Sequence, residues 1–252
     1  MKETTIDQTL VLCDLDSLLL DAAGNLPQLQ RDVLQLFASR GGRLTVFSQR
    51  SPRAVRSLLG GVRLSAPALV CGGTLAYNFS EGSGTALCSF EGMEESVLKK
   101  LPSLSGVGIA LQMRDGSTRA VRMSEGLAFH LKQEWTPFVL SNAADVKGED
   151  VMRILLYQDK KQMPILPTLQ KALGDAAAFL HAERLAPDTL VLTPGLVSGS
   201  AMLNAVCPPS GYAAEQLTCW PAAPRCSTLS IWRGRALCLR MPRLNCALPP
   251  TG

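Results

Sequence analysis

The sequence predicts an α/β fold in which a parallel sheet is built from alternating strands and helices. Three observations predict it. Short apolar runs alternate with amphipathic segments over the first eighty residues, and Gly or Pro residues separate them. Acidic and small polar residues follow the ends of the apolar runs. From residue 80 the pattern changes to a turn-rich mixture of short helical and strand-like segments, which is typical of an inserted α+β unit.

The first strand is expected at residues 9–13, where the chain is continuously apolar. Pro27 opens the next element, because proline is favoured at the first position of a helix. Glycines at positions 41 and 42 stop that helix. Its apolar residues recur at helical spacing: Leu29, Val33, Leu36 and Phe37. Strand and helix together form the first half of a βαβ unit.

A second strand at residues 44–47 and a third at residues 68–71 continue the alternation. Between them Ser51 and Pro52 form an N-cap and first-turn pair for a short helix, which two glycines at positions 60 and 61 close. Strands joined in this way by helices lie parallel, and a ligand site is then expected at their carboxyl ends.

The segment from residue 80 to 186 is expected to be a separate α+β domain. Helices are predicted at residues 93–101, 124–135 and 167–173, and strands at residues 151–158 and 189–194. We therefore divide the chain into an N-terminal core part (1–79), an inserted unit (80–186) and a C-terminal core part (187–252).

Asp14 and Asp16 follow the first strand and are separated by one residue. Residues two apart on a strand point to the same side, so the two acids are expected to share one space. Such a pair suits phosphoryl transfer, in which one carboxylate attacks phosphorus and the other moves a proton. The alternative is an ordinary turn whose two carboxylates are solvated or cap a helix.

Four stretches in order, DLDSLLLDAAGNLP, SRGG, LTVFSQR and APALVCGGTLAYNF, resemble the N-terminal half of the haloacid dehalogenase (HAD) superfamily, specifically its Cof-type sugar-phosphate phosphatases. The likeness covers residues 9–79 well and the stretch TLVLTPGLVSGSAML more weakly. It implies a Rossmann-like parallel sheet core with an inserted α+β cap domain that closes over the phosphate site.

The resemblance also implies roles for individual residues. Asp14 would be the nucleophile and Asp16 the general acid/base, and both would hold a Mg²⁺ ion that neutralises the crowded charge. The expected substrate is a small phosphorylated metabolite resembling a sugar phosphate. The phosphate would be held by the hydroxyl of Ser48, by backbone N–H groups after Asp14, and by residues near the second and third motifs: Leu15, Ser48, Gly73 and Ser198.

The chain departs from the family pattern at several motif positions. Ser17 and Leu18 stand where the family has Gly-Thr, Gln49 replaces a glycine, and Gly72 replaces an asparagine. Ser198 stands where a lysine neutralises phosphate and aspartate in the family. The acidic fourth motif, which completes the Mg²⁺ shell, is replaced by TCWPAAPRC without a carboxylate. Mg²⁺ binding and turnover are therefore expected to be impaired.

The segment after Leu217 differs in composition from the rest of the chain. Five of the 25 basic residues lie there without any acidic residue, so the formal charge of +4 comes from this segment. Its four cysteines lack the close pairs of a zinc site, and its arginines form no recognisable nucleic-acid-binding module: Cys219, Cys226, Cys238 and Cys246. The third interpretation is a frameshift near Leu217, with residues 218–252 out of frame.

Composition limits the remaining classes of function. With 252 residues and 46% hydrophobic residues the chain can bury a core, and no apolar run approaches the roughly 18 residues of a membrane span. The start MKETTIDQ lacks the pattern of a secretion signal, so we expect a cytoplasmic protein without membrane or nucleic-acid partners. The leading hypothesis is a phosphomonoester hydrolase of low activity. The alternatives are a non-catalytic protein that binds a phosphorylated ligand or partner, and a non-functional frameshifted product.

Overall fold

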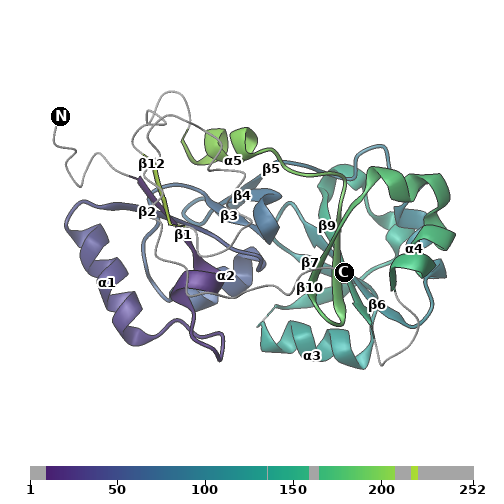
Figure 1. Cartoon of the computed structure of the whole chain (residues 1–252), viewed down its shortest axis with the longest axis horizontal. Coiled ribbons are helices and arrows are strands. Elements are labelled where there is room, and N and C mark those ends of the chain that lie inside the picture. Colours follow the sequence, from purple (N-terminus) through teal and green to yellow (C-terminus); the bar gives the residue numbers. More distant parts are fainter. Residues whose placement is uncertain (1–9, 135, 159–164, 208–216, 221–252) are drawn as a thin grey trace, which may run out of the picture.

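A computed structural model describes residues 10–134, 136–158, 165–207 and 217–220. Within these residues the strands form two sheets, which lie side by side along the long axis of the molecule (Figure 1). The first sheet has the order β12-β1-β2-β3-β4-β5 and the second has the order β10-β11-β9-β6-β7-β8. The predicted fold class, an α/β core with an inserted α+β unit, is confirmed.

The first sheet is parallel from β12 to β3 and antiparallel beyond it. The central strands of this sheet are apolar because both of their faces are covered. In β2 every residue after Arg43 is buried, as expected of a strand between two layers. The strands are β1 (Leu10–Asp14), β2 (Arg43–Phe47), β3 (Ala68–Val70), β4 (Leu75–Asn78), β5 (Ser83–Ala86) and β12 (Leu217–Trp220).

Helix α2 (Pro52–Leu59) confirms the prediction made from its end signals. The Ser51 hydroxyl accepts a hydrogen bond from the backbone N–H of Ala54 at 3.3 Å, and Pro52 occupies the first turn. Gly60 ends the helix with φ = 50°, a left-handed conformation that glycine adopts without strain. Local sequence alone therefore fixes both ends of this element.

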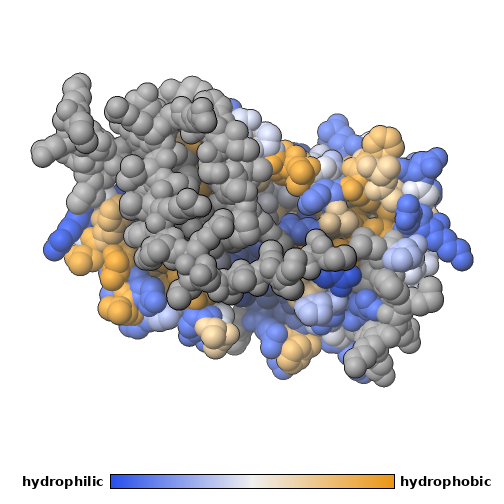
Figure 2. Space-filling view, in the orientation of Figure 1, coloured by the Kyte–Doolittle hydropathy of each residue, from blue (hydrophilic) through white to orange (hydrophobic). Residues whose placement is uncertain are grey.

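Helix α1 (Gln28–Ser39) is also present, but its apolar periodicity does not mark the face that packs on the sheet. Leu34 is buried, whereas Leu29, Val33 and Leu36 are 72%, 56% and 51% exposed. Figure 2 shows hydrophobic residues on the surface where Figure 1 places α1. The i, i+4, i+7 pattern thus identified the helix and not its buried side.

The second sheet is antiparallel except for its β7–β8 pair. Its core contains the fully buried Phe90, Ile109 and Leu111. The strands are β6 (Val107–Met113), β7 (Thr118–Arg122), β8 (Phe138–Leu140), β9 (Val151–Gln158), β10 (His181–Ala186) and β11 (Thr189–Thr193). The helices near it are α3 (Glu125–Gln133) and α4 (Ile165–Leu173), and α5 (Gly199–Val206) follows as the chain returns to the first sheet.

Some expected element positions differ from the structure. Residues 93–101 form turns and the start of a 3₁₀ helix, η4 (Leu98–Ser103), which contains Pro102, rather than the predicted α-helix. β5 pairs with β4 in the first sheet, and β11 pairs with β10 in the second. Both expected domain boundaries, after residues 79 and 186, thus fall between paired strands, and the division of the chain at these positions stays a prediction.

Candidate functional site

The carboxyl ends of β1, β2 and β3 bring the first two candidate motifs together. The backbone N–H of Ser48, directly after β2, donates to the Leu69 carbonyl at 2.8 Å. The N–H groups of Cys71 and Gly72 donate to the carbonyls of Arg50 and Ser48 at 2.9 and 3.0 Å. These backbone bonds hold the loops after β2 and β3 in fixed positions, as expected for a ligand site at this edge.

Asp14 is the last residue of β1 and is 6% exposed. Its Oδ1 accepts a hydrogen bond from the backbone N–H of Ser17 at 3.1 Å, so it caps the short helix η2 (Leu15–Leu19). This element is one turn of π-helix, closed by the Leu20 N–H on the Leu15 carbonyl at 3.1 Å. Isolated π turns frequently occur at functional sites.

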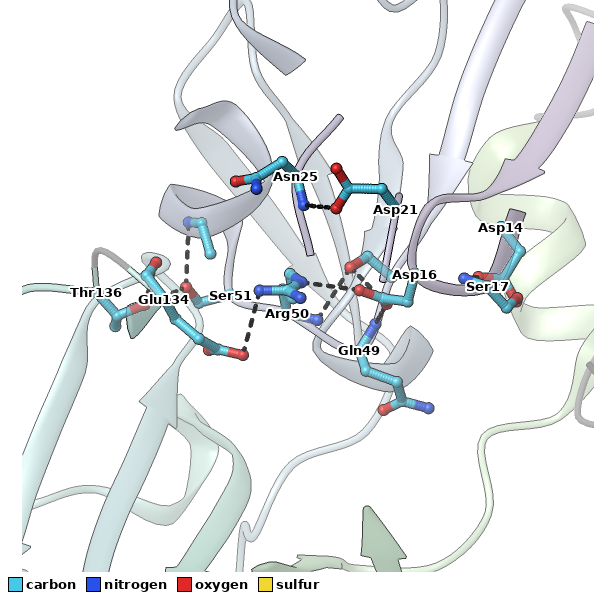
Figure 3. A network of polar contacts seen from close by, with 12 residues as sticks. Asp14, Asp16, Ser17, Asp21, Asn25, Gln49, Arg50, Ser51, Glu134 and Thr136 are labelled. Carbon is cyan, nitrogen blue, oxygen red and sulfur yellow. Dashed lines mark hydrogen bonds and ion pairs between the residues drawn. The ribbon is translucent and has the colours of Figure 1, made fainter. Parts of the chain in front are cut away.

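Asp16 accepts hydrogen bonds on both carboxylate oxygens. Its Oδ2 accepts from the Ser48 hydroxyl at 2.9 Å and from the Gln49 backbone N–H at 2.6 Å. Its Oδ1 forms an ion pair with Nε of Arg50 at 2.9 Å. Figure 3 shows Arg50 between Asp16 and Glu134. The carboxylate is therefore bound by the turn that follows β2.

The expectation that both acids share one space is wrong for their present orientation. Figure 3 shows the Asp14 carboxylate beside Ser17, apart from the group formed by Asp16, Gln49 and Arg50. The reason is that the strand ends at Asp14, and Asp16 already belongs to η2. The alternation of side chains along a strand does not extend into a π turn.

The other predicted phosphate-binding residues lie in different surroundings. Gly73 is buried in the 3₁₀ turn η3 (Cys71–Gly73) that follows β3, with φ = 83°, and the Leu15 side chain is fully buried. Ser198 is exposed, and its hydroxyl caps α5 by accepting from the Ala201 N–H at 3.1 Å. Within the described residues no contact joins Ser198 to either acid. Its phosphate-binding role stays a prediction.

Charged residues of the second sheet region complete the surroundings, and sequence reasoning did not assign them to the site. Glu134, just after α3, lies 3.7 Å from Arg50 and 3.8 Å from Nε2 of His130. A cavity of about 370 Å³ adjoins this group, and its polar lining residues are Asn25, Arg50, Ser57, His130, Gln133 and Glu134. Only tertiary structure brings residues 50 and 134 together, so no local sequence signal could have found this group.

The residues present do not fit the Mg²⁺ site that the resemblance implies. Mg²⁺ requires about six oxygen ligands in octahedral geometry. Both oxygens of Asp16 are already bound by Arg50, Ser48 and Gln49, and one oxygen of Asp14 caps η2. No three His, Cys, Asp or Glu side chains of the described residues form a metal-binding group. The sequence after residue 217 contains no acidic residue to supply a further ligand.

The reactivity of the Cys88 thiol tests how deeply this residue is buried near the junction of the two sheets. Burial raises its pKa from an ordinary 9.0 to about 11, with a smaller contribution from Cys71. Because the thiolate is the reactive form, alkylation of Cys88 should accelerate about tenfold per pH unit from pH 7 to 10 without levelling off. Mass spectrometry of the alkylated peptide measures this rate. The same residue in a synthetic peptide should level off above about pH 9, and identical profiles would contradict the burial of Cys88.

Comparison with known proteins identifies the fold. No protein-family model matches the sequence, and no curated protein matches it. Many solved structures do match. One is a haloacid dehalogenase-like hydrolase from Bacteroides thetaiotaomicron, with a TM-score of 0.72 and 15% sequence identity over 86% of this chain and 83% of that one. A HAD subclass IIB sugar phosphatase matches with a TM-score of 0.65 and 11% identity over 90% and 85% of the two chains.

A third solved structure, a haloacid dehalogenase-like hydrolase from B. subtilis, matches with a TM-score of 0.64 and 14% identity over 88% of this chain and 85% of that chain. The identities are low, so these likenesses concern the fold. The chain has the fold of haloacid dehalogenase-like hydrolases with a cap domain. Among the described residues no helix is long and apolar enough to cross a membrane.

Proposed function

We propose that this chain, which has the fold of haloacid dehalogenase-type hydrolases, slowly hydrolyses a phosphomonoester of a small, sugar-phosphate-like metabolite. One observation carries the proposal. The contact between Asp16 and Ser48 at 2.9 Å joins the two candidate motifs at the carboxyl edge of the parallel sheet, where β1 ends with the buried Asp14. In such a fold a ligand binds at this edge, where carboxylate and hydroxyl groups can contact it.

In the proposed reaction the Asp14 carboxylate attacks phosphorus and the ester P–O bond breaks. Asp16, released from the turn at residues 48–50 and carrying a proton taken from solvent, delivers that proton to the leaving oxygen, which departs as an alcohol. Water then attacks the aspartyl-phosphate and gives its proton to Asp16, so that inorganic phosphate is released and both acids are restored. The carboxylate of Asp14 must turn from the Ser17 N–H toward the ligand for the first step.

Two features of the site support low turnover. Both Asp16 oxygens accept hydrogen bonds from the turn at residues 48–50, which competes with contact to a leaving group. Ser198 supplies no positive charge where the family pattern has a lysine. Fixed positive charges that face the developing negative charge are commonly the largest contribution to catalysis of this kind.

A second candidate function is binding of a phosphorylated ligand without turnover. The ion pairs that join Asp16, Arg50 and Glu134 favour it, because they hold the expected general acid in a structural role. The fold and the site edge would then be kept for recognition alone. A cytoplasmic location and the absence of nucleic-acid and membrane partners stay predictions from the sequence.

An assay of the purified chain with an aryl phosphate tests the proposal, with Mg²⁺ varied from a chelated to a millimolar level. We expect slow, saturable release of the aryl alcohol above the rate of the protein-free reaction. Absence of turnover at every Mg²⁺ level, together with measurable binding of inorganic phosphate, would support the binding function instead. Absence of both would overturn the proposal. The nucleotide sequence around Leu217 decides the separate question of the reading frame.

A further inference from the structure

Three consecutive residues after Ser48 each contact the part of the chain that builds the second sheet. Gln49 accepts hydrogen bonds from Arg153 of β9. Arg50 lies 3.7 Å from Glu134, and the Ser51 hydroxyl is 3.1 Å from the Thr136 hydroxyl. Residues of the second-sheet region therefore contact the turn that follows β2 at three consecutive positions.

Arg153 makes the most buried of these contacts, since the residue is 3% exposed. Its guanidinium donates to the side-chain oxygen of Gln112, to the backbone carbonyl of Gln49 and, at 3.3 Å, to the Gln49 side-chain oxygen. All three acceptors are neutral, and within the described residues no carboxylate forms an ion pair with this arginine. A buried charge needs such hydrogen bonds, so loss of Gln49 as an acceptor is strongly unfavourable.

The turn that accepts hydrogen bonds from Arg153 is the same turn that donates hydrogen bonds to Asp16. The Gln49 N–H donates to Asp16 at 2.6 Å while the Gln49 carbonyl accepts from Arg153. One residue thus connects the buried cation of the second sheet with the carboxylate of the first. Hydrogen bonds to both sides of Gln49 fix the position of its backbone.

Two departures from the family motifs add a side-chain contact to this connection. Gln49 supplies a side-chain acceptor where the family pattern has glycine. Gly72 leaves room for it, because a Cβ at residue 72 would lie 2.8 Å from the Gln49 Oε1 and 3.4 Å from a guanidinium nitrogen of Arg153. The side-chain contact therefore depends on residues 49, 72 and 153, whereas the bond from Arg153 to the backbone carbonyl at position 49 needs no particular side chain there.

We propose that Arg153 is a positioning residue that acts through Gln49 to couple the placement of the second sheet to the orientation of Asp16. The role in catalysis rests on the proposed function, whereas the physical coupling does not. If Arg153 were purely structural, it would stabilise β9 and Gln112, and its removal would leave the turn at residues 48–51 unchanged. The two possibilities differ in what happens at the first sheet when the guanidinium is removed.

Hydrogen–deuterium exchange of the Arg153→Gln variant tests the coupling without any need for activity. Amides of Gln49, Arg50, Cys71 and Gly72 are all hydrogen-bonded in the turn or to it. We expect exchange in the peptides that contain them to accelerate at least about tenfold, the effect of losing hydrogen bonds to a charged group. The control is Arg119→Gln, on β7 of the same sheet. Exchange at wild-type rates in these peptides would overturn the proposal.

A double-variant cycle tests whether the effect passes through Gln49. Gln49→Gly removes the side-chain acceptor and remains informative even if the Arg153→Gln chain fails to fold. We expect faster exchange at residues 71 and 72 in Gln49→Gly, partial recovery in Arg153→Lys, and a smaller increase on adding Arg153→Gln to Gln49→Gly than Arg153→Gln causes alone, because only the backbone carbonyl at position 49 still accepts from Arg153. Fully additive effects, or wild-type exchange in Gln49→Gly, would contradict coupling through this residue.

Kinetics separate this proposal from the proposed function. If the wild-type chain turns over an aryl phosphate, Arg153→Gln should change kcat by a larger factor than KM, because it alters the placement of the Gln49 N–H that holds Asp16. A change in KM with an unchanged kcat would contradict a role of Arg153 through Asp16. If the wild-type chain shows no turnover, the proposed function fails and the exchange experiment still decides the coupling.

Discussion

Replacing Asp14 with asparagine should lower the hydrolysis of an aryl phosphate by on the order of 10³-fold or more, because the amide cannot attack phosphorus. The fold should survive. The Asn Oδ1 can still accept from the Ser17 N–H, and asparagine is as good an N-cap as aspartate. Steady-state kinetics together with circular dichroism of the variant measure both expectations.

Asp21→Asn is the matched control for this prediction. Asp21 is an exposed carboxylate on the same side of the first sheet, whose Oδ1 accepts from the N–H groups of Ala23 and Asn25 at 2.9 Å. Its amide preserves those bonds, so wild-type turnover is expected. Equal activity of Asp14→Asn and the wild-type chain would remove Asp14 from the mechanism and leave the binding function as the better explanation.

Replacing Phe90 with alanine should lower the free energy of unfolding by about 3–5 kcal/mol, the usual effect of removing a buried aromatic ring. Phe90 is fully buried in the core of the second sheet, and its backbone N–H donates to the Val151 carbonyl at 3.1 Å. The cavity left by the ring refills only in part, because the close-packed residues around it relax incompletely. Urea unfolding followed by circular dichroism gives the change.

Phe129→Ala provides the comparison, since Phe129 lies on α3 and is 60% exposed. We expect it to alter the unfolding free energy by less than about 0.5 kcal/mol. If both phenylalanine variants lose the same stability, the burial assigned to Phe90 is wrong.

The sequence predicted β1, β2 and β3 of the first sheet and the helices between them, because their end signals are local, but it did not predict β4, β5 or β12. Ser51, Pro52 and Gly60 act within a few residues, and the helix forms between them as expected. Strand β9 was also predicted with its observed bounds, since its apolar run is continuous. The sequence did not predict β6, although β6 is buried throughout. Its segment VGIALQM contains a glycine and a glutamine and has no clear strand pattern, and pairing with β7 and β9 stabilises it as a strand.

The candidate site was predicted in part. The resemblance located Asp14, Asp16 and Ser48 at one sheet edge, and the structure brings Asp16 and Ser48 into contact. The π turn after β1 could not be foreseen from strand alternation, and it separates the two carboxylates. Contacts of the turn with Glu134 and Arg153 depend on how the second sheet packs, which no short-range pattern in the sequence encodes.

Gly72 and Gln49 should show non-additive effects when they are substituted together. A Cβ at position 72 would lie 2.8 Å from the Gln49 Oε1, so an alanine there would move the Gln49 side chain away from Arg153. Removing the Gln49 side chain first removes this close contact. Gly72→Ala is therefore expected to cost less stability in a Gln49→Gly background than in the wild-type chain.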